Sequence, residues 1–168
     1  VIGGKLPIAD SACVTGDSGT LVCESCEFVD SFLQFSPDIT VLLNIDDDHM
    51  DYFKTMDNLK NSFKKFVCMG KICYANGDDA NVKDVVSGIG LKVVTYGFND
   101  DNDIVIKNLE TDSDYSKFDL YIEGELYGNF LLPLFGNHMV SNAASAIYMC
   151  KTIGISLEDI KKYLKTFK

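Results

Sequence analysis

The stretch Ile39-Thr40-Val41-Leu42-Leu43-Asn44 decides the fold, because it is apolar and β-branched along most of its length. A strand with one wet face alternates apolar and polar side chains, whereas a strand buried on both faces does not. Runs of the same character occupy residues 20–23, 71–75 and 92–96. The sequence therefore predicts a mostly parallel sheet that is covered by helices on both faces.

Helical patterns separate these runs. Residues 56–66 place Leu59, Phe63 and Phe66 on one helical face, and residues 81–87 carry three valines at helical spacing. Alternation of strand and helix along the chain indicates the α/β class.

The pattern changes after residue 103, where Phe118, Leu120 and Ile122 alternate with more polar side chains. A turn around Gly124 leads into a second run at residues 126–132, which predicts a small antiparallel unit with one wet face. Two helices, at 138–152 and 157–167, are expected to complete one domain over residues 1–168.

Composition excludes several functions. The 168 residues include 15 basic and 25 acidic side chains, a formal charge of -10, which argues against binding a nucleic-acid backbone. No run approaches the roughly 18 apolar residues of a membrane span, and the first residues do not resemble a secretion signal, so we expect a cytoplasmic protein that does not enter a membrane. An acidic protein can still hold a nucleotide when a divalent cation bridges carboxylate and phosphate.

The six cysteines leave one alternative open. Cys23 and Cys26 have C-x-x-C spacing, and Cys68 with Cys73 would complete a four-thiolate zinc site in a stand-alone metal-binding module. Buried, reduced thiols are favoured over zinc, because cysteine is among the most buried residue types.

Two acidic clusters follow two of the predicted strands. The ligand-binding edge of an open parallel sheet lies past the carboxyl ends of its strands, so neighbouring strands would bring the clusters together. A carboxylate and an imidazole meeting there suit a divalent cation, although acidic residues at strand ends often serve only as helix caps. The clusters are Glu24, Glu27 and Asp30 after the first strand, and Asp46, Asp47, Asp48, His49 and Asp51 after the second.

The segment Asn44-Ile45-Asp46-Asp47-Asp48-His49-Met50-Asp51 resembles the signature T-N-I-x-x-D-H-x-D of the Mur ligase family. Glu24 lies 25 residues before His49, at the spacing of the family's metal-binding glutamate. Further matches to the family are Gly136-Asn137-His138 and Asn142-Ala143-Ala144. Ser31-Phe32-Leu33 and Thr95-Tyr96-Gly97-Phe98 favour the branch that adds L-alanine to UDP-N-acetylmuramate, or the closely related murein-peptide ligases.

The resemblance implies an ATP-dependent ligase that activates a muramoyl carboxylate as an acyl phosphate, which the amino group of L-alanine then attacks. It implies Glu24 and His49 as magnesium ligands, Asn44 and Asp48 as residues that shape the site, and His138 with Asn142 beside the adenine. The implied fold is the P-loop-like middle domain of the family, an α/β sheet with a small antiparallel unit.

Some positions depart from the family pattern. The motif E-A-D-E-S-D is replaced by Glu24-Ser25-Cys26-Glu27-Phe28-Val29-Asp30, which leaves the role of Asp30 open. Met139 stands where an adenine-side asparagine is expected, and the carbamylated lysine of sister ligases has only loose counterparts in Lys60 and Lys64.

The phosphate-binding loop G-x-x-x-x-G-K-S/T does not occur in the sequence. We therefore expect a fragment that lacks this loop and the N- and C-terminal domains of the ligase, and that is inactive alone. A murein-peptide ligase or another Mur ligase stays open as the parent, because the missing C-terminal domain would select the amino acid.

Overall fold

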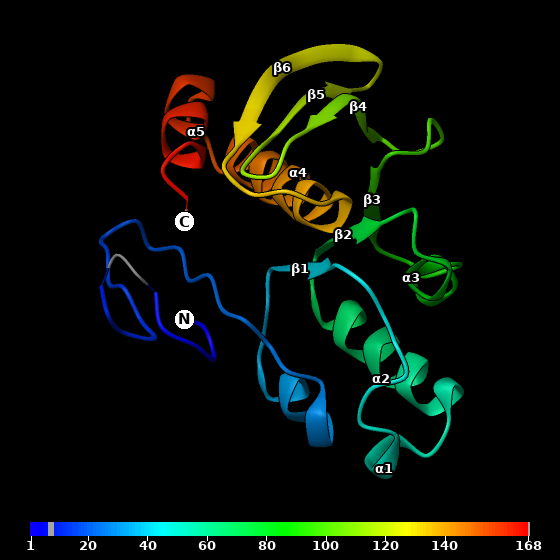
Figure 1. Ribbon diagram of the computed structural model, residues 1–168. Helices are drawn as coiled ribbons and strands as arrows, with labels where there is room; N and C mark the ends of the chain where they lie inside the picture. The colour runs from blue at the N-terminus through cyan, green and yellow to red at the C-terminus, as the bar shows by residue number, and fades with distance from the viewer. Residues whose placement is uncertain (7–8, 168) are drawn as a thin grey trace.

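The computed structural model describes residues 1–6 and 9–167, and a single six-stranded sheet organises it (Figure 1). Strands follow in the order β1-β2-β3-β4-β5-β6, with parallel pairing from β1 to β4 and antiparallel pairing from β4 to β6. The strands are β1 (Ile39–Leu42), β2 (Ile72–Asn76), β3 (Lys92–Gly97), β4 (Ile104–Thr111), β5 (Ser116–Ile122) and β6 (Glu125–Leu132). The predicted α/β class and the antiparallel unit are confirmed.

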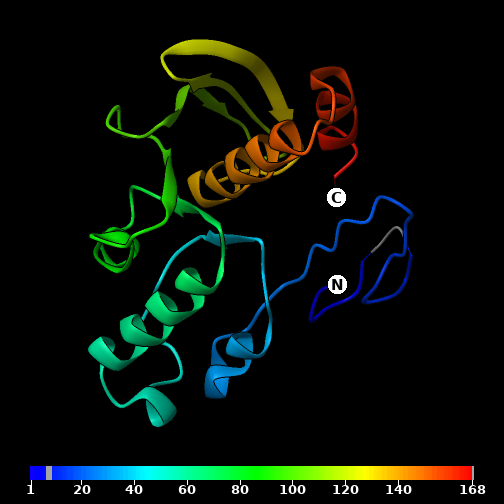
Figure 2. The same cartoon turned by 180° about the vertical axis from the view of Figure 1, so that it is seen from behind.

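Helices cover both faces of the parallel half, as the unbroken apolar runs predict (Figures 1 and 2). Side chains alternate along β2: Cys73 and Ala75 pack with α2 and α3, whereas Tyr74 packs in the cluster that includes α4. The helices are α1 (Met50–Phe53), α2 (Met56–Met69), α3 (Ala80–Val86), α4 (Asn137–Thr152) and α5 (Leu157–Leu164), with a 3-10 segment η1 (Phe28–Gln34) before β1.

Local signals fix the helix ends. The Thr55 side chain accepts the Asn58 N–H at the start of α2, and the Ser156 side chain accepts the Asp159 N–H at the start of α5, the capping that its spacing favours. Gly154, with φ +87°, follows the end of α4 as the sequence indicates. Helix α5 ends at Leu164, three residues before the predicted end.

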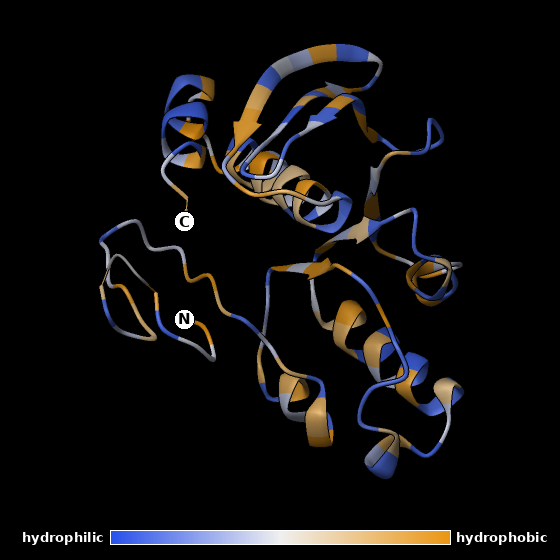
Figure 3. Cartoon of the chain, viewed as in Figure 1, coloured by the Kyte–Doolittle hydropathy of each residue, from blue (hydrophilic) through white to orange (hydrophobic). Residues whose placement is uncertain are grey.

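The antiparallel half has one covered face. Phe118 and Leu120 of β5 and Phe130 of β6 are buried with Ala144 and Ile147 of α4. Figure 3 shows hydrophilic and hydrophobic bands alternating along β6, the pattern of a strand with one wet face.

The prediction of a strand at residues 20–23 is wrong. These residues form no strand, and Leu21 and Val22 are 74% and 61% exposed. Figures 1 and 2 show the segment before η1 at one side of the molecule, apart from the strands. A strand needs a partner for its backbone groups, and none of the strands in the described residues pairs with residues 20–23. Among the described residues β1 pairs with β2 alone.

No helix within the described part of the chain combines the length and the apolar character that crossing a bilayer requires.

Candidate functional site

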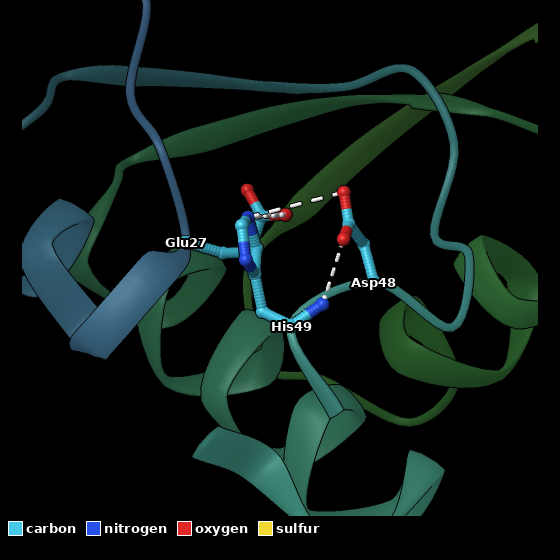
Figure 4. Close-up of side chains that lie close together, drawn as sticks. All are labelled: Glu27, Asp48 and His49. Carbon is cyan, nitrogen blue, oxygen red and sulfur yellow. Dashed lines mark hydrogen bonds and ion pairs between the residues drawn. The ribbon is translucent and has the colours of Figure 1, made fainter. Parts of the chain in front are cut away.

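The loop that follows β1 carries an imidazole and a carboxylate, and a second carboxylate reaches them from the start of η1. His49 Nε2 lies 3.8 Å from Glu27 Oε1 and 3.9 Å from Asp48 Oδ2, and Figure 4 shows both carboxylates turned toward the imidazole. The three candidate ligand atoms lie within 4.8 Å of one another. This group is the only one of its kind among the residues that the structure describes.

Backbone geometry presents these side chains. His49 has φ +54° and immediately precedes α1, and its N–H donates to Asp48 Oδ1 at 2.8 Å. Glu27 immediately precedes η1, so two short helical segments approach each other at the site. The His49 and Glu27 side chains are 31% and 24% exposed, whereas that of Asp48 is 74% exposed. The group is therefore open to solvent and to an incoming ion.

Glu24 does not join this group. Its Oε2 accepts the Gly3 N–H at 2.7 Å, and the structure brings Glu27 beside His49 in its place. The 25-residue spacing to His49 locates Glu24 along the chain but does not fix its side chain, because residues 20–23 form no strand that would hold it at the sheet. In the sequence, Glu27 stands out only as a member of the first acidic cluster. Its position three residues after Glu24 is the one sequence feature that could have pointed to a place beside His49.

The other predicted site residues lie in two places. Asn44 donates from Nδ2 to Asp46 Oδ2 at 2.9 Å, within the loop that leads from β1 to His49. His138 and Asn142 are on α4, four residues apart and hence on one side of the helix. Asn142 lies inside α4, whose N-cap is Gly136, so it is not the helix cap that its residue type also allows.

Gly136 shapes the approach to His138. Its φ of +103° is a conformation that side chains disfavour, and an added Cβ would lie 3.0 Å from His138 Cε1. The glycine thus permits the imidazole to fold back over the start of α4.

The four thiols of the zinc alternative do not assemble among the described residues. Cys73 is fully buried in the sheet, and burial raises the pKa of its thiol to about 11. Cys68 and Cys26 are exposed, and Cys23 donates its thiol hydrogen to Glu24 O. A protonated core thiol is a poor zinc ligand, since zinc binds the thiolate.

Comparison with known proteins identifies the family of the chain. The sequence model of the Mur ligase middle domain matches residues 11–150. The chain belongs to the Mur ligase family. The predicted resemblance is confirmed.

Several relatives match this Mur ligase chain over its full length. Among them are two UDP-N-acetylmuramate–L-alanine ligases, 42% identical in Clostridium acetobutylicum and 37% identical in Caldanaerobacter subterraneus subsp. tengcongensis. The chain spans 37% of the length of each relative.

A solved Mur ligase has the same fold. The MurF ligase from Thermotoga maritima, crystallised in complex with ADP, is 18% identical and has a TM-score of 0.67, covering 83% of this chain and 33% of its own.

Proposed function

We propose that this chain is the nucleotide-binding middle domain of a longer UDP-N-acetylmuramate–L-alanine ligase that acts in the cytoplasm. The observation that carries the proposal is the imidazole–carboxylate group at the carboxyl end of β1, in a chain 42% identical to such a ligase. The relatives' greater length supports placing the phosphate-binding loop and the N- and C-terminal domains outside these residues.

The reaction proposed is ATP-dependent amide formation. The terminal phosphoryl group of ATP passes to the muramoyl carboxylate, and the amino group of L-alanine then attacks this acyl phosphate and expels phosphate. The ADP in the Thermotoga maritima relative supports ATP as the nucleotide. UDP-N-acetylmuramate and L-alanine are the proposed substrates.

The residues at the end of β1 fit a magnesium ion. Carboxylate oxygens are the ligands that this hard cation prefers, and a neighbouring imidazole completes a mixed set. His49 with Glu27 is the ligand pair that the 3.8 Å separation favours, and His49 with Glu24 is the pair that the family signature favours. When bound, the ion would supply neutralisation of phosphate charge.

The remaining residues would position the ligands and the nucleotide. Asn44, by bonding Asp46, holds the loop that carries His49, and Asp48 bonds the His49 N–H while its second oxygen faces the imidazole. His138 and Asn142, on one side of α4, are proposed to lie beside the adenine.

L-alanine-dependent ADP release by the complete ligase tests the proposal. His49→Ala should lower the rate by about two orders of magnitude or more, because a lost ligand removes electrostatic stabilisation of phosphoryl transfer. Asp38→Ala is the control, since Asp38 bonds Lys71 at the opposite end of β1. Normal activity of His49→Ala would contradict the proposal.

The same assay separates the two glutamates. If Glu27 is the ligand, the rate of Glu27→Ala should fall to that of His49→Ala, and Glu24→Ala should keep far more of its activity. The reverse order would assign the metal to Glu24. Peptides offered in place of L-alanine identify a murein-peptide ligase if they are the better substrates.

The 168-residue chain alone should release no ADP in response to L-alanine. Alanine-dependent hydrolysis by the purified chain would show that the other domains are dispensable.

A further inference from the structure

Asp30 follows Glu27 by three residues, and its carboxylate accepts hydrogen bonds from two different helices. The Tyr52 hydroxyl donates to Oδ2 at 2.7 Å, and the Ser62 hydroxyl donates to Oδ1. Tyr52 belongs to α1, which begins directly after His49, and Ser62 is buried in α2. The carboxylate thus joins the segment that carries Glu27 to the segment that carries His49.

Aromatic contacts make the same connection. The Phe28 ring lies 4.7 Å from the His49 imidazole and 6.3 Å from the Tyr52 ring, measured between centroids. The Tyr52 N–H donates to His49 O at 2.9 Å. A displacement of Tyr52 would therefore be transmitted to the imidazole through both the ring contact and the backbone.

The backbone here needs such restraints. Val29, Asp30 and His49 have φ of +50°, +57° and +54°, a left-handed conformation that residues with a Cβ rarely adopt. Such conformations persist where surrounding contacts fix them. The bonds to Ser62 and Tyr52 hold the pKa of Asp30 below its usual 3.8, so the carboxylate is ionised and accepts both bonds at neutral pH.

We propose that Asp30 is a positioning residue, which holds the Glu27 carboxylate beside the His49 imidazole and thereby sets the affinity of the site for a divalent cation. The inference rests on the metal site of the proposed function. Asp30 acts through the other residues in this proposal, because it lies outside the Glu27, Asp48 and His49 group and each of its oxygens accepts a hydrogen bond from a hydroxyl group.

Binding of Mn²⁺ to the complete ligase, followed by electron paramagnetic resonance of the free ion, tests the positioning role without relying on turnover. Asp30→Ala should raise the dissociation constant about 10-fold, the scale at which residues that orient metal ligands act. Tyr52→Phe and Ser62→Ala each remove one of the two bonds and should raise it about threefold. In steady-state assays the Mg²⁺ concentration for half-maximal rate should rise, with kcat at saturating Mg²⁺ unchanged.

Asp38→Ala is the matched control. It removes a carboxylate with a single bond, to Lys71 Nζ at 2.6 Å, from the other end of β1, and it should leave Mn²⁺ binding unchanged.

The outcomes separate the two proposals. An unchanged Mn²⁺ dissociation constant in Asp30→Ala overturns the positioning role, even if the melting temperature falls. If His49→Ala also leaves binding unchanged, the metal site of the proposed function fails as well. Should Asp30→Ala not fold, Tyr52→Phe decides, because it deletes one hydroxyl and keeps the ring, and an unchanged constant there also overturns the role.

Discussion

Acidic residues follow both β1 and β2, but the two strand ends differ in how their carboxylates are bonded. After β2, Asp79 caps α3 by accepting the Val82 N–H, and Asp78 accepts the Phe98 and Asn99 N–H groups and the Asn102 side-chain amide. After β1, the Asp48 carboxylate takes one backbone N–H, that of His49, and its second oxygen lies toward the imidazole.

This difference shows which of the two acidic clusters, the one after β1 or the one after β2, has a structural role. A carboxylate whose lone pairs are filled by backbone N–H groups joins two segments and has little capacity left for a ligand. A carboxylate that is partly free beside an imidazole has capacity for a cation. Asp79 therefore serves as a helix cap, whereas the Asp48 carboxylate after β1 keeps capacity for a cation.

The largest expected effect concerns the contact between Gly97 and the carboxyl group of Asp78, which follows β2. Gly97 packs against the Asp78 carboxyl so closely that an added Cβ would overlap it. Gly97→Ala should lower the free energy of unfolding by about 3 kcal/mol, through crowding and the loss of Asp78 bonds. Chemical denaturation measures this.

Gly90→Ala is the control for that substitution, because its Cβ would meet open space and the change should stay within about 0.5 kcal/mol. Equal effects of the two substitutions would show that the Asp78 carboxyl group is not tightly packed against Gly97.

Removing the two carboxylates directly compares the strand ends. Asp78→Ala leaves three N–H donors without their charged acceptor and should cost about 2 kcal/mol. Asp48→Ala, at an exposed side chain, should cost less than about 0.5 kcal/mol. Similar losses of unfolding free energy in both variants would contradict the distinction between a structural role for Asp78 and a ligand-binding role for Asp48.

A divalent cation should stabilise the folded chain only by binding at the site that follows β1. At ten times its dissociation constant, Mg²⁺ should raise the free energy of unfolding by about 1.4 kcal/mol, because it binds the folded state. Thermal unfolding with and without Mg²⁺ should show this shift in the unchanged chain and in Asp78→Asn, but not in His49→Ala. A shift that survives in His49→Ala would move the metal site elsewhere.

The smallest effect is a pH dependence at Asp30. Its pKa is lowered in the folded chain, first by Ser62 and then by Tyr52, so its ionised form stabilises the fold above the unfolded pKa near 3.8. That contribution, below about 1 kcal/mol after solvent screening, is lost as pH falls through the lower folded pKa.

Unfolding of the chain and of Asp30→Asn should therefore differ at pH 5 and converge well below pH 3.8. Replacing Ser62 by Ala and Tyr52 by Phe should remove most of the difference, and a difference that grows toward low pH would reverse the sign of the argument.

Much of the sheet could be predicted from the sequence. The runs that became β1, β2 and β3 are recognisable because burial on both faces leaves few polar positions, and the alternation in β5 follows from its single wet face. The short segments η1 and α1 could not be predicted, since three of their residues and neighbours, Val29, Asp30 and His49, take left-handed conformations that no periodicity encodes.

The sequence by itself determined the α/β class, the family and the position of His49 after β1, because these depend on apolar patterns and on spacing along the chain. Tertiary structure alone decided that residues 20–23 stay outside the sheet, and that Glu27 lies beside the imidazole whereas Glu24 bonds Gly3. It also decided that the Asp78 carboxylate accepts backbone N–H groups with both oxygens, whereas one oxygen of Asp48 lies toward the His49 imidazole. The physical reason is that these outcomes depend on which donors reach each carboxylate in space, and residues distant in sequence supply most of those donors.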